Sequence, residues 1–408
     1  MLARIEPESL GLSADRLARL GGWMDGYVGS GKLPGCLTAV MRRGALVYFE
    51  CRGMADQEAG RAVARDTVFR IYSMSKPIVT VAAMTLFEEG RFQLDDPVSR
   101  FLPEFADTTV WVSGQGGAMK TEPPAEAMKI WHLMSHTSGL VYGGRSEGPV
   151  GDAYLKAGIN FGQRNDGVLA DMVRAVAKLP LNAHPGAAWE YGVSTDVLGR
   201  LVEAVAGQPL DQILQQRIFD PLGMTDTGFQ VRPDQRARLA ALYSAHDGGI
   251  VLEERPDEEA SFVRPVTLFS GGGGLVSTAG DYLRFAEAVR RKGELDGARI
   301  LGRRTVELMT MNHLPGNVDL TAMGQPTFSE TSMDGIGFGL GFSVVLDPAT
   351  TKAACSVGEH AWGGVASTAF WIDPVEDIVA VFMTQVLPSS TYPIRRELRA
   401  LVYQALID

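Results

Sequence analysis

The sequence predicts an α+β fold: an antiparallel sheet formed by strands from both ends of the chain, flanked by helices, with an inserted, mostly helical lobe. Strand-like alternation occurs near the N-terminus and returns after residue 335, whereas helical spacing of apolar residues dominates from about residue 74 to 290. We therefore expect a discontinuous α/β domain of residues 1–72 and 291–408, a helical domain of residues 73–290, and an active site between the two.

The first part of the chain predicts one helix and one β-hairpin. Residues 13–29 repeat apolar side chains at helical spacing, and Ser13 is suited to cap this helix. The segment "CLTAVMRRGALVYFECRG" alternates as two short strands that turn at Arg43-Gly44. The N-terminal contribution to the sheet is thus one antiparallel pair.

The middle and the end of the chain predict helices followed by strands. The expected helices cover residues 76–90, 126–135, 167–178, 195–206, 209–217 and 279–292. Strand patterns follow in "GFGLGFSVVL", "VASTAFWID" and "DIVAVFMTQ", of which the last two meet at a turn over 374–377. A helix of about residues 393–406 closes the chain.

Composition limits the classes of partner. The formal net charge is -10 and the chain has no run of basic residues, which argues against a nucleic acid or an anionic membrane as partner, because both would require a positive face. Charged residues near the N-terminus interrupt any secretory signal, and no 18-residue apolar run occurs. Three scattered cysteines fit thiols in a reducing compartment. We expect a cytoplasmic protein without a membrane anchor that acts on a small molecule.

A nucleophile beside its base is one interpretation of "FRIYSMSKPIVTVAAM", residues 69–84. Pro77 is tolerated only in the first turn of a helix, so the helix begins at or just after Ser73 and places Lys76 on the same face. The free N–H groups of that turn favour an alkoxide and disfavour an ammonium, which suits a base. The alternative, a capping serine beside a solvated lysine, has equal weight on this segment alone.

A phenol comes from "PGAAWEYGVSTDVLGRLVEAV", in which Tyr191 precedes a helix that Ser194 is expected to cap. A tyrosine there can relay protons together with a lysine. The alternative is a tyrosine that covers the edge of the core.

The third element is "GEHAWGGVASTAFWIDP", where Trp362-Gly363-Gly364 is expected to open a strand. Two glycines let a ligand approach the backbone and leave the Val365 N–H free for an oxyanion. A β-bulge with a core tryptophan is the alternative.

These motifs, in this order, resemble the serine β-lactamase and penicillin-binding-protein superfamily. "SMSK", "LMSHTSGL", "YGVS", "SGGGGLVSTAGDYLRF" and "WGG" resemble one branch of it, the family VIII carboxylesterases, from about residue 10 to the end. The resemblance implies that Ser73 is the nucleophile and that Lys76 and Tyr191 form a proton-transfer pair. It also implies an oxyanion hole formed by the N–H groups of Ser73 and Val365. The implied substrate pocket is formed by Trp362, Gly363, Gly364, Tyr142 and Phe269.

Two departures from class C β-lactamases bear on the substrate. Val193 stands where those enzymes have the asparagine of Tyr-x-Asn, and Trp362 stands at the lysine of Lys-Thr-Gly. Both changes remove polar groups that hold a lactam, so the resemblance implies hydrolysis of short-chain acyl esters. An acyltransferase of the same fold, a β-lactamase or D-alanyl peptidase, and a non-catalytic binding protein are the alternatives.

Other motifs do not indicate a cofactor or a metal. "SGGGG" lacks the Gly-Lys-Ser/Thr ending of a phosphate loop and predicts a turn before a helix capped by Thr278 and Asp281. His132 and His136 lack the His-Glu-x-x-His pattern of zinc helices. We expect neither a metal nor a cofactor.

Overall fold

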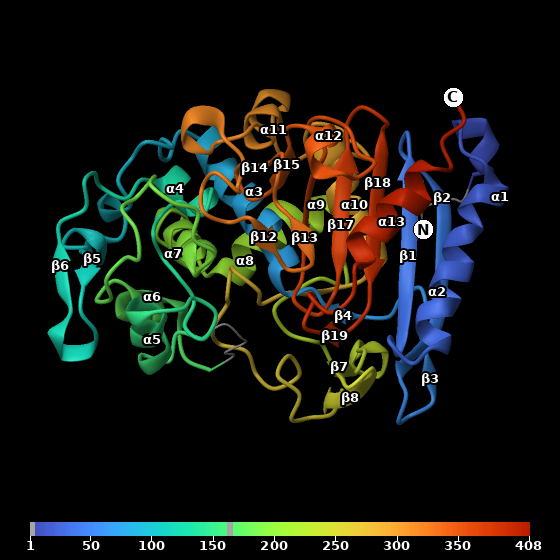
Figure 1. Cartoon of the computed structure of the whole chain (residues 1–408), viewed down its shortest axis with the longest axis horizontal. Helices are drawn as coiled ribbons and strands as arrows, with labels where there is room; N and C mark the ends of the chain where they lie inside the picture. The colour runs from blue at the N-terminus through green and yellow to red at the C-terminus, as the bar shows by residue number, and fades with distance from the viewer. Residues whose placement is uncertain (1–4, 161–165) are drawn as a thin grey trace.

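An eight-stranded antiparallel sheet joins the two ends of the chain in the computed structural model, which describes residues 5–160 and 166–408 (Figure 1). In spatial order its strands are β14 (Ile336–Phe338), β15 (Ser343–Val345), β16 (His360–Gly363), β17 (Ala369–Asp373), β18 (Ile378–Met383), β1 (Gly35–Arg42), β2 (Ala45–Asp56) and β3 (Arg61–Ala62). The pairing of β1 with β18 confirms the predicted sheet of N-terminal and C-terminal strands.

All residues of β1 are buried, because its side chains point alternately to the two faces of the sheet and each face is covered by a hydrophobic core. Leu37 and Ala39 belong to one hydrophobic core, and Cys36 and Val40 belong to a second core on the other face. The second core is closed by α1 (Ala14–Leu17), α2 (Arg19–Gly29) and α13 (Ile394–Tyr403). α10 (Ala279–Arg290) packs against β17 and β18 on the face of the first core, so both faces of the sheet are covered.

The remaining helices form the lobe beside the sheet and short connections around it (Figure 1). They are α3 (Ser75–Glu88), α4 (Ile130–Met134), α5 (Pro149–Lys156), α6 (Leu169–Val176), α7 (Ser194–Ala206), α8 (Leu210–Leu214), α9 (Asp220–Leu222), α11 (Arg303–Met309) and α12 (Pro348–Thr351). Small sheets pair β4 (Phe69–Arg70) with β9 (Val276–Ser277), β5 (Val110–Ser113) with β6 (Lys120–Glu122), β10 (Glu294–Leu295) with β11 (Ala298–Arg299), and β12 (Thr327–Phe328) with β13 (Thr331–Ser332). A further sheet has the order β19 (Val386–Leu387), β7 (Leu242–His246) and β8 (Gly249–Glu254).

Local signals predicted several element boundaries correctly. The Ser13 side chain accepts a hydrogen bond from the Arg16 N–H, and Thr278 accepts one from the Asp281 N–H, so both residues cap their helices. Arg43 and Gly44 have positive φ angles of 50° and 84°, as a tight hairpin requires.

Two local predictions were wrong. Val193, not Ser194, is the N-cap of α7, because the Ser194 hydroxyl instead shares a 2.8 Å hydrogen bond with the Ser138 hydroxyl. The Trp362-Gly363-Gly364 segment ends a strand rather than opening one, since β16 stops at Gly363 and β17 begins only at Ala369.

Helix α3 runs through the largest hydrophobic core and carries the serine motif at its start. Residues 75–86 are all buried, and α3 packs against α7. A buried, well-packed helix fixes the position of its first turn, on which a precise site depends. Among the described residues, no helix combines the length and the apolar content needed to cross a membrane.

Candidate active site

The serine motif lies in a short 3-10 turn and the first turn of α3. Ser73 is in a 3-10 turn, Tyr72–Met74, and Tyr72 has a φ of 42°, which is uncommon for a residue with a side chain. Pro77 lies in the first turn of α3, as its restricted geometry predicts. Ser73 is therefore presented at a helix start.

Two proton-carrying groups meet the Ser73 hydroxyl. The Lys76 Nζ lies 3.1 Å from Ser73 Oγ, and the Tyr191 hydroxyl donates a 2.7 Å hydrogen bond to the same oxygen. Lys76 is only 2% exposed, and its Nζ also donates a 2.6 Å hydrogen bond to the Gly272 carbonyl oxygen. Within residues 5–160 and 166–408, Lys76 forms no ion pair. An amine at hydrogen-bond distance from a serine hydroxyl, with no carboxylate paired to it, is placed to take up the hydroxyl proton.

Aromatic rings hold Tyr191 in place. Its ring centroid lies 4.9 Å from that of His136, 5.7 Å from Trp189, 4.8 Å from Phe328 and 5.6 Å from Trp362. Burial holds the pKa of His136 well below its usual value, so this imidazole is neutral and adds no charge beside the phenol. The rings restrict Tyr191 to the orientation in which its hydroxyl meets Ser73.

The glycine-rich loop before α10 supplies the carbonyl that binds Lys76. Asp196, on α7, accepts a 2.5 Å hydrogen bond from the Ser270 hydroxyl and a 3.1 Å bond from the Gly272 N–H. A Cβ on Gly272 would lie 2.6 Å from Asp196 Oδ2 and 2.7 Å from the Tyr142 hydroxyl, so a larger residue does not fit there. The sequence predicted only a turn in this loop, whereas the structure places its backbone against the candidate base.

The two glycines of the third motif lie in close contact with other segments of the chain. A Cβ on Gly363 would lie 2.8 Å from the Thr368 carbonyl oxygen, and a Cβ on Gly364 would lie 2.6 Å from the Ile71 carbonyl oxygen. The space is thus filled by the chain itself. This close approach brings Val365 to the turn that carries Ser73, and both residues line the same two cavities.

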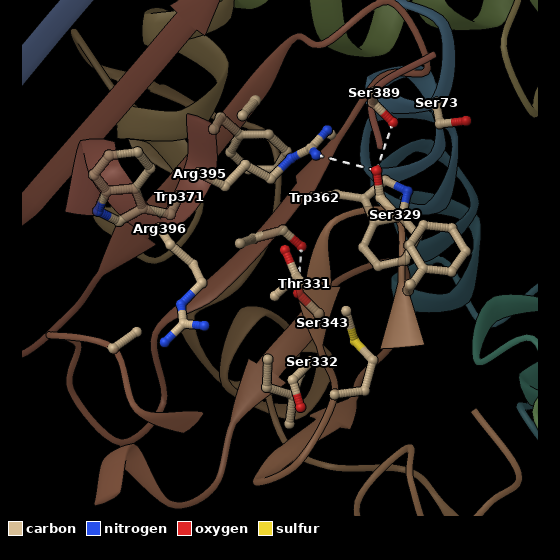
Figure 2. A pocket seen from close by; sticks show the side chains of 18 of the residues that line it. Ser73, Ser329, Thr331, Ser332, Ser343, Trp362, Trp371, Ser389, Arg395 and Arg396 are labelled. Carbon is tan, nitrogen blue, oxygen red and sulfur yellow. Dashed lines mark hydrogen bonds between the residues drawn. The ribbon is translucent and has the colours of Figure 1, made fainter. Parts of the chain in front are cut away.

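A larger and a smaller cavity meet at Ser73, with volumes of about 350 Å³ and about 70 Å³. Trp362, Gly363 and Gly364 line the larger one, which Figure 2 shows extending from Ser73 and Trp362 toward Trp371 and Arg396. The smaller one is lined by residues that include Tyr142.

Phe269 lines neither cavity. Its ring packs 5.1 Å from that of Phe229, although its neighbours Leu268 and Ser270 do line the smaller cavity. The structure therefore separates Phe269 from the other residues that the sequence selected for the site.

Among the residues of the larger cavity that sequence reasoning missed are Arg145 and Phe328. The Arg145 guanidinium lies 4.6 Å from the Phe328 ring centroid and 5.3 Å from that of Tyr191. Arg145 lies in a turn and Phe328 ends the short strand β12, and no periodic pattern in the sequence marks either position. In the part of the chain that the structure describes, no cluster of three or more histidine, cysteine or acidic side chains could hold a metal ion.

Comparison with known proteins relates this geometry to a family. The family model described as Beta-lactamase matches residues 20–404. The chain belongs to the beta-lactamase family. It is 37% identical to Protein Rv1367c of Mycobacterium tuberculosis over 88% of this chain and 87% of the relative. It is 33% identical to Esterase EstB of Burkholderia gladioli over 98% of this chain and 99% of that protein.

A solved structure shares both the fold and the sequence similarity. The structure titled "EstCE1, a hydrolase with promiscuous acyltransferase activity" superposes with a TM-score of 0.79, at 31% identity, over 95% of this chain and 99% of that one. Membership of the beta-lactamase family together with relatives named esterase and hydrolase makes this chain a serine hydrolase.

Proposed function

We propose that this member of the beta-lactamase family is a carboxylesterase that hydrolyses short-chain acyl esters through an acyl-enzyme on Ser73. The observation that carries the proposal is the contact of one buried hydroxyl with two proton carriers, Lys76 Nζ at 3.1 Å and the Tyr191 hydroxyl at 2.7 Å. A serine hydroxyl needs such a partner to become a nucleophile.

In this mechanism Ser73 Oγ attacks the ester carbonyl while Lys76 and Tyr191 take up its proton. The N–H groups of Ser73 and Val365 form the oxyanion hole that stabilises the tetrahedral intermediate. The alcohol leaves with a proton from the pair, and water then attacks the acyl-enzyme by the reverse sequence of proton transfers. The two residues act as general base and general acid in turn.

An apolar wall supports esters over lactams as substrates. Trp362 is 7% exposed, lines the larger cavity and packs 5.1 Å from the Phe328 ring. An indole carries no positive charge to pair with the carboxylate of a penicillin or cephalosporin, and a hydrogen bond between charged groups of that kind is worth about 1.5–3 kcal/mol. Val193 likewise offers no hydrogen bond from its side chain.

The proposal is tested by comparing esters with lactams. We expect p-nitrophenyl esters from acetate to hexanoate to be cleaved with kcat/KM at least about a hundredfold above that of a chromogenic cephalosporin. Comparable values for the two classes would contradict the proposal. No cleavage of any ester by folded protein would favour a non-catalytic binding protein.

Acyl transfer is the second candidate, because EstCE1 is described as a hydrolase with promiscuous acyltransferase activity. Transfer uses the same residues and differs only in the acceptor, an alcohol instead of water. Product analysis with added primary alcohols separates the two, since an acyltransferase forms more new ester than free acid when both acceptors are present.

A further inference from the structure

Ser73 stands where two cavities of very different size meet. The larger has a volume of about 350 Å³ and the smaller about 70 Å³, and Ser73 and Val365 line both. An ester has two parts, an acyl group and an alcohol, that extend in different directions from the carbonyl carbon. The two cavities therefore offer each part a separate place, and the question is which part lies in which cavity.

Proton transfer decides the side of the alcohol. In acylation the bond from Ser73 Oγ to the carbonyl carbon forms, the bond from that carbon to the alcohol oxygen breaks, and the serine proton ends on the departing oxygen. The departing oxygen must therefore face the group that delivers the proton. Tyr191, which donates the 2.7 Å hydrogen bond to Ser73 Oγ, lines the larger cavity and does not line the smaller one, as far as the described residues extend.

Tyr142 is the phenol beside the smaller cavity and is a poor candidate for the same role. It lines the smaller cavity, and its hydroxyl lies 3.5 Å from Lys76 Nζ. Burial, together with the negative charge of Asp196 nearby, raises its pKa well above the usual value for a tyrosine. A phenol with so high a pKa gives up its proton reluctantly.

We propose that the alcohol part of the substrate occupies the larger cavity and the acyl chain the smaller one, so that the substrates are esters of a short acyl chain with a bulky alcohol. This assignment rests on the esterase function proposed above. The aromatic faces of Tyr191, Phe328 and Trp362 at the Ser73 end suit an aryl or cyclic alcohol. The apolar side chains of Met172 and Leu268 in the smaller cavity limit the acyl chain to a few carbons.

Two series of esters vary one part at a time. In the first, p-nitrophenyl esters from acetate to octanoate keep the alcohol constant. In the second, acetates of primary alcohols from ethanol to 2-naphthylethanol keep the acyl group constant and are followed by pH-stat titration. We expect kcat/KM to fall at least tenfold between butyrate and octanoate, and to stay level or rise as the alcohol grows.

One methionine in each cavity provides a matched pair of variants. Met172 lines the smaller cavity and Met333 the larger one. We expect Met172→Ala to extend the accepted acyl chain by two or more carbons and Met172→Phe to shorten it, with the alcohol series unaltered. Met333→Ala should change only the alcohol series, and Met311→Ala, at an exposed methionine outside both cavities, should change neither.

The outcomes separate this assignment from the proposed function. If Met333→Ala moves the acyl-chain limit and Met172→Ala does not, the alcohol and acyl sites are reversed and the inference is overturned, while the esterase function stands. If the folded wild-type protein cleaves no ester of either series, the esterase function itself fails and the assignment fails with it.

Discussion

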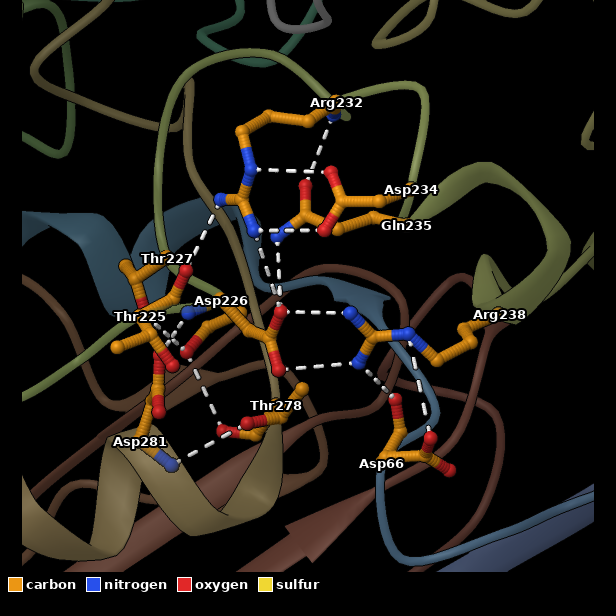
Figure 3. A network of polar contacts seen from close by, with 11 residues as sticks. Asp66, Thr225, Asp226, Thr227, Arg232, Asp234, Gln235, Arg238, Thr278 and Asp281 are labelled. Carbon is orange, nitrogen blue, oxygen red and sulfur yellow. Dashed lines mark hydrogen bonds and ion pairs between the residues drawn. The ribbon is translucent and has the colours of Figure 1, made fainter.

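Two polar regions of the molecule lie at the starts of two helices and are built on opposite principles. Beside the start of α10, the Asp226 carboxylate lies 2.6 Å from the Arg238 guanidinium and 3.5 Å from that of Arg232. Figure 3 shows both arginines turned toward Asp226. We call these three residues and Asp281 the Asp226 network. The hydrogen bonds that Arg238 donates to Asp226 lower the pKa of the Asp226 carboxyl. The charges of Asp226, Arg238 and Arg232 are paired with charges of opposite sign.

Before α3, the Ser73 site contains no matched pair of charges. Lys76 is surrounded by the oxygens of Ser73, Gly272 and Tyr142 and by the ring of Tyr191, whose centroid lies 4.6 Å from Nζ. A lysine that an ion pair held in its protonated form would be unable to accept a proton. The comparison therefore predicts that substitutions at the Ser73 site reduce activity with little loss of stability, and that substitutions in the Asp226 network do the reverse.

The largest effect is expected from substitution of Ser73. Ser73→Ala should lower kcat by about 10⁴ or more and abolish labelling by a phosphonate, as measured by mass spectrometry. Stability should fall by no more than about 2 kcal/mol, since Lys76 keeps its bond to the Gly272 carbonyl oxygen and the Tyr191 hydroxyl, which loses its acceptor, belongs to a residue that lines a cavity.

Ser75→Ala is the matched control. The buried Ser75 hydroxyl accepts the Leu275 N–H at 3.1 Å, so its loss should cost about 1–3 kcal/mol of stability while labelling persists. A phosphonate bound to Ser75, Ser135 or Ser194 instead of Ser73 would show that the nucleophile is assigned wrongly.

Substitutions of Lys76 and Tyr191 should have effects on kcat that depend on each other, because both side chains contact the same oxygen, Ser73 Oγ. Lys76→Ala and Tyr191→Phe should each lower kcat by about 10²–10⁴, and the double variant should lose far less than the product of the two. The pH profile of kcat/KM should report the pair rather than either residue. Tyr142→Phe, which removes a more distant phenol, should cost less than about tenfold. Losses that multiply fully would mean that the two groups act independently.

The sequence allowed the sheet to be predicted because its signal is local, whereas the chemical groups of the site were selected by the order of three motifs and their resemblance to a known family. Pro77 fixes where the helix that carries Ser73 and Lys76 begins. The strands that join the two chain ends are marked by alternation of apolar residues along the sequence. Tyr191 came from a separate motif, and the structure brings its hydroxyl to Ser73 Oγ.

What the sequence could not supply depends on contacts between distant segments. Ser194 is a good capping residue, but the Ser138 hydroxyl on another segment binds it instead. Gly364 is needed because the Ile71 backbone passes close to it, which no local pattern reveals. Phe328 and Arg145 reach the cavity only through the tertiary fold.

Asp281 should make stability depend on pH. Burial raises its pKa from the usual 3.8 to about 6, so between these values the unfolded chain loses the proton first. The free energy of unfolding should therefore fall as pH rises from about 4 to about 6, by at most about 3 kcal/mol from this group. For Asp281→Asn, the free energy of unfolding measured in urea should fall less over this pH range than that of the wild type. Asp107→Asn, at an exposed aspartate, should keep the decline of the wild type; equal slopes in wild type and Asp281→Asn would contradict the assignment.

Asp226→Asn should give the smallest effect and the clearest contrast with Ser73→Ala. The substitution removes the charge that Arg238 and Arg232 share, and the bonds to Arg238 are about four-fifths shielded from solvent, with exposed fractions of 23% and 21% for the two side chains. We expect a loss of about 1–2 kcal/mol, seen as a lower midpoint in thermal unfolding. Activity at 25 °C should stay within twofold of wild type, because Asp226 lines neither cavity. Asp234→Asn, which removes an exposed partner of Arg232, should cost less than about 0.5 kcal/mol. A large loss of kcat/KM in folded Asp226→Asn protein would mean that the network also supports the chemistry, and the separation of the two regions would not hold.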